Sequence, residues 1–154
     1  MPPLRLFVCR VQKEFASERA ALGAYLRADP LLRRFFEPFL FEEVPAADRR
    51  ADEVYLDEVE RCDVYVGMLG QEYGPVNADG LSPTQREFDL ATLRHKHRLV
   101  FIKGSDDKQK DPKMQALIRR ADGELIRRRF TTTPELIAGV YASLVPCNTI
   151  SFAY

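Results

Sequence analysis

The chain has 154 residues, of which 45% are hydrophobic and 30% are charged, the composition of one folded domain and not of a disordered segment. Lys and Arg number 23, as do Asp and Glu, so the net charge gives no reason to expect binding to nucleic acid or to a membrane surface. The three cysteines lack the spacing of metal ligands, and no apolar stretch is long enough to span a bilayer. We therefore expect reduced thiols in a cytoplasmic protein.

The first half of the chain alternates between strand-like and helix-like patterns. Residues 4–9 form an apolar run typical of a strand, and Phe15, Leu22 and Leu26 then share one face of a helix over 13–29. The expected elements that follow are a strand over 37–44, a loop over 45–50, a helix over 52–62 and a strand over 63–70.

The second half continues this alternation after a polar loop over 71–80. Ser82 and Pro83 predict the start of a helix, because serine caps a helix and proline suits its first position, and Gln85 is placed to close a capping box. The remaining expected elements are a strand over 98–104, a helix over 111–121, a strand over 123–130, a helix over 133–145 and an irregular tail over 146–154.

Five strands that alternate with five helices define the fold class. Strands that are apolar throughout are typical of a parallel sheet covered on both faces. Right-handed crossovers leave few topologies and favour the flavodoxin-like strand order 2-1-3-4-5. We therefore expect one three-layer α/β domain, with a five-stranded parallel sheet, over residues 1–145.

The topology also predicts where a ligand would bind. In such sheets, ligands lie beyond the carboxyl ends of the strands, near the point between strands 1 and 3 where the strand order reverses. The loops that reach this place cover residues 9–13, 42–50 and 70–82. In the last of them, Gly70 and Gly74 would let a ligand approach the backbone, and Tyr73 could stack on a base, although a turn-rich connection would show the same pattern.

Glu87 is the strongest candidate for chemistry. A helix that begins after Ser82 places Glu87 in the second turn, at the edge of the apolar arc that contains Phe88. A carboxylate there can stabilise an oxocarbenium ion or attack the C1 carbon of a sugar, as carboxylates do in glycoside cleavage. The structural alternative is a glutamate on the helix flank that pairs with Arg86 or Arg94.

Other charged residues have simpler explanations. Glu18 and Arg19 flank the apolar face of the first helix, and we expect an ion pair that tethers this helix to the sheet, with a contribution to the cleft as the alternative. The charged stretch 48–50 either binds a phosphate or is solvated. His95 and His97 do not share a helix face, so we expect no metal site.

Three segments carry a resemblance to a known family: "LFVCRVQKEFASERAAL", "YLDEVERCDVYVGMLGQEYG" and "LSPTQREFDLA". In this order they resemble the bacterial family of domains of unknown function numbered 4062, over roughly residues 4–145. That family is similar to the wider group of TIR and nucleoside deoxyribosyltransferase-like domains. This chain departs from the family pattern at Cys9 and Arg10, where a serine pair is common, and at Gln85, which replaces the first glutamate of the helix motif.

The resemblance implies a role for Glu87. In active members of the wider group, a glutamate on the helix after strand 3 performs N-glycosidic chemistry, and Glu87 corresponds to it. We expect no certain cofactor, and NAD or a nucleoside as ligand or substrate. The ligand-binding residues that we expect are Cys9, Arg10, Gly70, Tyr73, Gly74 and Ser82.

Three functions follow from these expectations. We rank first a TIR-like nucleotide-sensing or self-assembly module, the N-terminal part of a larger bacterial regulator, whose partners are other copies or attached downstream domains. The alternative is an enzyme that cleaves the N-glycosidic bond of NAD or a nucleoside through Glu87. A further alternative is a module of a DNA-associated regulator, although the arginines over 127–129 are typical of a protected edge strand.

Overall fold

The computed structural model describes residues 2–9, 13–40 and 44–151, with side chains described up to residue 147. Its core is one parallel sheet of five strands in the order β2-β1-β3-β4-β5. The strands are β1 (Leu4–Val8), β2 (Phe36–Phe39), β3 (Val64–Leu69), β4 (His97–Lys103) and β5 (Arg127–Phe130). The predicted fold class and strand order are confirmed.

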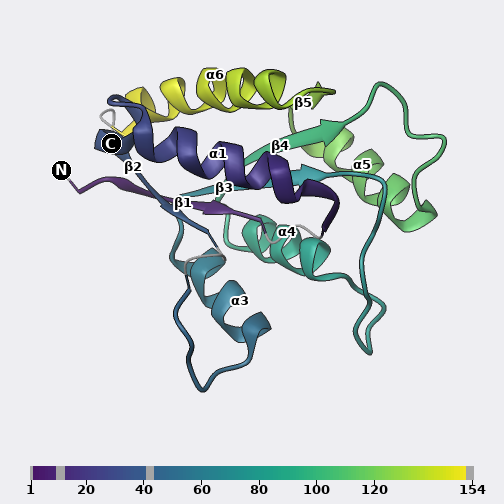
Figure 1. Cartoon of the computed structure of the whole chain (residues 1–154). Coiled ribbons are helices and arrows are strands. Elements are labelled where there is room, and N and C mark those ends of the chain that lie inside the picture. The colour runs from purple at the N-terminus through teal and green to yellow at the C-terminus, as the bar shows by residue number, and fades with distance from the viewer. Residues whose placement is uncertain (1, 10–12, 41–43, 152–154) are drawn as a thin grey trace.

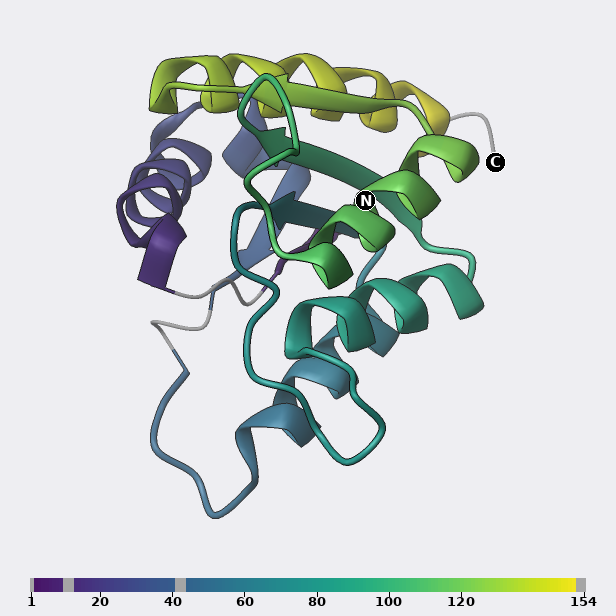
Figure 2. The same ribbon diagram turned by 90° about the vertical axis from the view of Figure 1, so that its right-hand side faces the viewer.

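Helices cover both faces of the sheet, as continuous apolar strands require. One face is covered by α1 (Ala16–Ala28) and α6 (Thr133–Ser151), and the other by α3 (Ala51–Arg61), α4 (Pro83–Leu93) and α5 (Pro112–Glu124) (Figures 1 and 2). A 3₁₀ turn over Lys13–Phe15 precedes α1, and a single turn, α2 (Leu32–Phe35), precedes β2. In the described part of the chain, no helix has the length and apolar character needed to cross a membrane.

The two outer strands are shorter than predicted. β2 covers Phe36–Phe39, not 37–44, and begins directly after α2, whose first N–H groups are bonded by the side chain of Asp29. Pro38 fits this edge strand, because an edge position tolerates a missing N–H. β5 is also short, because α5 continues through Glu124 into the region predicted as strand. The predicted segment 41–43 lies outside the described residues.

The last helix is longer than predicted. The chain was expected to become irregular at residue 146, but α6 continues through Ser151 with Pro146 inside it. Val140, Leu144 and Cys147 are all buried, and their spacing keeps one apolar face running past the proline. The burial of this face outweighs the hydrogen bond that Pro146 cannot make.

Aromatic rings fill the side of the core that faces α3 and α4. The Phe7 ring on β1 stacks between Phe39 on β2 and Tyr65 on β3, with ring centroids 5.8 and 5.9 Å away. Tyr55 of α3 meets Phe7 edge-on, and Phe88 of α4 meets Tyr65 in the same way. These contacts fix α3 and α4 against the sheet, and α4 carries Glu87.

Candidate functional site

Glu87 lies inside the protein. The helix that carries it begins as predicted, since Ser82 Oγ accepts the N–H of Gln85 at 3.2 Å and Pro83 occupies the first position. The side chain of Glu87 is only 1% exposed, and it belongs to the same buried face as Thr84, Phe88 and Ala91. A carboxylate at such a depth is uncommon in a folded protein.

The two arginines expected as alternative partners of Glu87 both contact carboxylates of α3. Arg94 binds Glu60 at 2.9 and 3.0 Å, and Arg86 pairs with Asp52 at 3.7 Å. Glu87 itself is buried, so it does not lie on an exposed flank of the helix.

The carboxylate of Glu87 acts electrostatically on two buried groups of the sheet. Burial raises the pKa of the Cys9 thiol to about 12, and the charge of Glu87 adds to the rise. Burial likewise raises the pKa of Tyr65 well above its usual value, with contributions from Cys9 and Glu87. Glu87 therefore lies near β3 and the end of β1, where the strand order reverses and ligands bind in such sheets.

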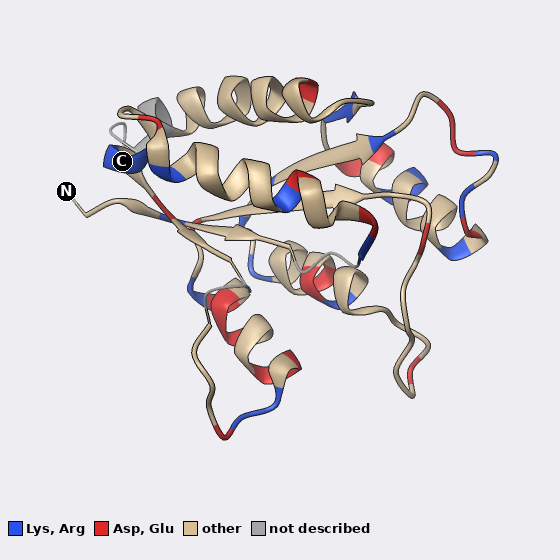
Figure 3. Cartoon of the chain, viewed as in Figure 1, with Lys and Arg blue, Asp and Glu red and all other residues tan. Residues whose placement is uncertain are grey.

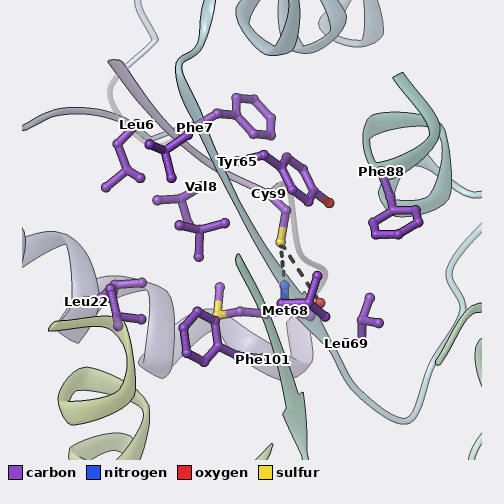
Figure 4. Packing of buried hydrophobic residues seen from close by; sticks show 14 of the residues in the cluster. Leu6, Phe7, Val8, Cys9, Leu22, Tyr65, Met68, Leu69, Phe88 and Phe101 are labelled. Atoms are coloured by element: carbon purple, nitrogen blue, oxygen red, sulfur yellow. Dashed lines mark hydrogen bonds between the residues drawn. The ribbon is translucent and has the colours of Figure 1, made fainter. Parts of the chain in front are cut away.

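Cys9 forms part of the wall of this region. Its sulfur accepts the N–H of Met68 at 3.1 Å (Figure 4), and its carbonyl oxygen accepts from the guanidinium of Arg19. The residue is 0% exposed. In this conformation the thiol holds β1 and β3 together and does not face solvent. Arg10, the other ligand-binding residue predicted for this loop, lies outside the described residues.

The loop after β3 is anchored by a residue that the sequence did not single out. The carboxylate of Glu14 accepts the backbone N–H groups of Gln71 and Glu72, each at 3.1 Å. Gly70 makes this possible, because a Cβ atom there would lie 2.5 Å from Glu14 Oε1. Gly70 thus allows a side chain to approach the backbone closely. The sequence led us to expect a ligand there, whereas in this structure the approaching group is the carboxylate of Glu14.

Tyr73 and Ser82 meet at the start of α4. The Tyr73 hydroxyl donates to Gln85 Oε1 at 2.5 Å, so Gln85 binds Tyr73 and does not close the predicted capping box. Tyr73 is 5% exposed, and the ammonium of Lys113 lies 5.6 Å from its ring centroid. Gly74 has a φ of 94°, a conformation that glycine adopts readily.

The predicted site residues therefore fall into two groups. Glu87 and Cys9 lie together beside Tyr65, while Tyr73, Gly74 and Ser82 shape the loop and the first turn of α4. Tyr65 escaped the sequence analysis because it sits in an apolar run, where its hydroxyl looks like part of a core position. The signal that could have found it is a polar atom in the middle of a strand predicted to be buried on both faces.

The charged pair of the first helix behaves as expected. Glu18 accepts from Lys103 of β4 at 2.9 Å, which ties α1 to the sheet. Burial alone would raise the pKa of Glu18, but the hydrogen bond from Lys103 lowers it below the usual value. The predicted ion pair between this helix and the sheet is confirmed.

Basic and acidic residues are interleaved along the helices and loops of the fold (Figure 3). The arginines of β5 illustrate this, since Arg127 pairs with Asp122 and Arg129 binds Asp107 with both terminal nitrogens. Within the described ranges, no group of three or more His, Cys, Asp or Glu side chains is placed to hold a metal ion.

Hollows lie around the start of α3. One of about 240 Å³ is lined by the segment from Val44 to Arg49 and by Tyr55. Another, of about 450 Å³, lies between the first turns of α3 and α4 and the loop after β3. Glu87 is not among the residues that line either hollow.

Comparison with known proteins places the chain in a family. It belongs to the family described as domain of unknown function DUF4062, which it matches over residues 5–145. No curated protein matches its sequence.

Two solved structures show the same fold. One is the CMP N-glycosidase BcmB of Clostridium botulinum, with a TM-score of 0.56 and 14% identity over 90% of this chain and 98% of that chain. The other is a conserved protein from Enterococcus faecalis V583, with a TM-score of 0.52 and 13% identity over 92% and 99% of the two chains. At these identities the likeness establishes the fold alone.

Proposed function

We propose that this domain cleaves the N-glycosidic bond of a nucleoside or nucleotide, with Glu87 as the catalytic carboxylate. The single observation that carries the proposal is the deep burial of Glu87 on α4, beside the strands where the sheet order reverses. The shared fold with a CMP N-glycosidase agrees with it. This function was the alternative on sequence grounds, and these observations favour it over the sensing module that we ranked first.

The chemistry requires a carboxylate close to the sugar C1 carbon. A Glu87 oxygen would attack C1 as the bond from C1 to the base nitrogen breaks, and the electron pair of that bond would leave with the base, which takes up a proton. Water would then attack C1, release the sugar with a hydroxyl group there, and regenerate the carboxylate. Exclusion of bulk water by the surrounding core would strengthen the electrostatic stabilisation of the positive charge on the sugar.

The test is direct. Purified protein is incubated with cytidine monophosphate, with nucleosides and with NAD, and the free base is measured by chromatography. We expect release of a base from one of these substrates, and a loss of about 10³-fold or more for Glu87→Gln, because the amide is a far weaker nucleophile. Glu72→Gln is the matched control, since Glu72 is an exposed glutamate on the neighbouring loop. Equal rates for Glu87→Gln and the parent protein would contradict the catalytic role.

A second candidate is nucleotide sensing without turnover. It is favoured by the 1% exposure of Glu87 and by the absence of this residue from the lining of the two hollows, because a ligand bound in either would not contact the carboxylate. In that case calorimetry would detect nucleotide binding while chromatography detects no free base. Sedimentation with and without the nucleotide would then test whether binding drives self-association.

A further inference from the structure

A groove of about 450 Å³ opens between α3, α4 and the loop after β3. One side of it is apolar and is formed by Pro75, Val76 and Leu81. Val76 is 52% exposed, which leaves apolar area for a ligand to cover. The groove falls within the size range of small-molecule sites, about 300–1,000 Å³.

The other side of the groove is basic. Arg50, at the start of α3, and Arg86, on α4, both lie in the lining, and they share a single carboxylate, that of Asp52. Arg50 Nε lies 3.3 Å from Asp52 Oδ1, and Arg86 Nη1 lies 3.7 Å from Asp52 Oδ2. Direct hydrogen bonds between charged groups are shorter, about 2.7–2.9 Å. Arg50 Nη2 also donates to Asp52 Oδ2 at 3.4 Å, so Arg50 contacts Asp52 through two nitrogens and only the Arg86 contact exceeds hydrogen-bond distance. The three side chains together carry one excess positive charge.

The far end of the same two helices provides a comparison. Eight residues further along both α3 and α4, Arg94 binds Glu60 at 2.9 and 3.0 Å. Both arginines thus join α4 to α3, but only Arg94 lies at the distance of a direct charge-assisted hydrogen bond, with its Nε–H shared between the two carboxylate oxygens of Glu60. Arg86 can therefore turn to a ligand without breaking a direct hydrogen bond to α3.

We propose that this groove binds a small organic phosphate. The phosphate takes the place of Asp52 as the shared partner of Arg50 and Arg86, and an apolar or aromatic group of the ligand covers Pro75, Val76 and Leu81. Arginine suits this role because its fork of donors matches phosphate oxygens. This site is separate from the chemistry proposed for Glu87.

Calorimetry on the full chain at low ionic strength tests the proposal, with phenyl phosphate and inorganic phosphate as probes. We expect phenyl phosphate to bind more tightly than inorganic phosphate, because only the former covers the apolar side. Arg86→Gln should weaken phenyl phosphate binding by about tenfold, since it removes a charge-assisted contact. Asp52→Asn should strengthen binding, because it removes the carboxylate that competes for the arginines.

Arg94→Gln is the matched control, with the same change of charge on the same helix and no contact with the groove. It should leave the affinity for phenyl phosphate unchanged. The proposal is overturned if neither probe binds, if the two probes bind equally, if Asp52→Asn weakens binding, or if Arg86→Gln and Arg94→Gln have equal effects. Circular dichroism of each variant shows that it is folded. Binding to the Glu87→Gln variant should be unaltered, which separates this outcome from a failure of the proposed enzyme activity.

Discussion

Glu14 Oε1 occupies the space in which a side chain on Gly70 would lie, 2.5 Å from the position of its missing Cβ atom. The same carboxylate accepts the next two backbone N–H groups of the chain, those of Gln71 and Glu72. The loop that leads from β3 to Glu87 is thus fixed at its first residues by the segment that follows β1.

Gly70→Ala should therefore destabilise the protein. The added methyl group would displace Glu14 and would also meet the Phe15 ring, 2.7 Å away, so we expect a loss of about 1–3 kcal/mol in the free energy of unfolding. Urea titration followed by circular dichroism measures it. Gly123→Ala is the control, because a Cβ atom at this position of α5 would meet no atom within 4 Å. That change should stabilise the helix by about 0.5–1 kcal/mol. A Gly70→Ala protein as stable as the parent would show that the Glu14 contact is dispensable.

The Asp107 carboxylate should make stability depend on pH. Hydrogen bonds from Arg129, and further ones from Lys110, hold its pKa well below the usual value of 3.8. The stabilisation is therefore complete above about pH 4, where the unfolded chain is also ionised, and it is lost as the pH falls toward the pKa of the folded state. Melting temperatures measured between pH 2.5 and 7 should show this decline.

Asp107→Asn should remove much of that pH dependence and lower stability at pH 7 by about 2 kcal/mol. The main cause is Lys110, whose side chain is only 3% exposed and would lose the carboxylate 2.6 Å from its ammonium. Asp106→Asn, a change at the exposed neighbouring residue, is the control. An Asp107→Asn protein with the same melting curve as the parent at every pH would contradict this assignment.

The cysteines should be unreactive in the folded protein. Cys9, Cys62 and Cys147 are all buried free thiols, and burial raises the pKa of each, to about 12 for Cys9 and to about 11 for Cys62. Because the thiolate is the reactive form, a disulfide reagent at pH 8 should modify them slowly until denaturant is added. Rapid reaction of one thiol in native buffer would show that the structure opens locally and exposes that cysteine, either around Cys9 or at the buried face of α6.

Cys9→Ser should be tolerated, since a hydroxyl can also accept the Met68 N–H.

Tyr65→Phe should leave stability unchanged or raise it by up to about 1 kcal/mol. The hydroxyl is buried and has no hydrogen-bond partner among the described residues, so the folded protein bears the free-energy cost of removing it from water. Tyr65→Phe removes this cost and keeps the ring contacts with Phe7 and Phe88. Tyr65→Ala should cost about 3–5 kcal/mol, because it also removes the ring. Thermal unfolding of both variants separates these effects. A clear loss of stability in Tyr65→Phe would mean that the hydroxyl has a partner after all.

The sheet could be predicted from the sequence because its signal is repeated. The central strands are rich in apolar residues and the crossover helices have periodic faces, so topology rules apply to the whole pattern at once. Ser82 and Pro83 likewise marked the start of α4 through local chemistry alone. The depth of Glu87 could not be predicted, because periodicity gives its direction on the helix but not how closely neighbouring elements cover it. The contact between Glu14 and the loop after β3 was hidden for a related reason, since it joins residues 57 and 58 positions apart.

Two neighbouring charged side chains of α1, Glu18 and Arg19, bind different strands. Arg19 donates to the carbonyl of Cys9 at the end of β1, and Glu18 binds Lys103 at the end of β4. These strands are not neighbours, because β3 runs between them. The helix therefore links the ends of β1 and β4 across β3, which lies between them. A circular permutation that opens the chain between β1 and α1 would weaken the attachment of α1 to these three strands. New chain ends should instead be placed in the exposed stretch before α3, because the contacts of α1 with β1 and β4 are then kept.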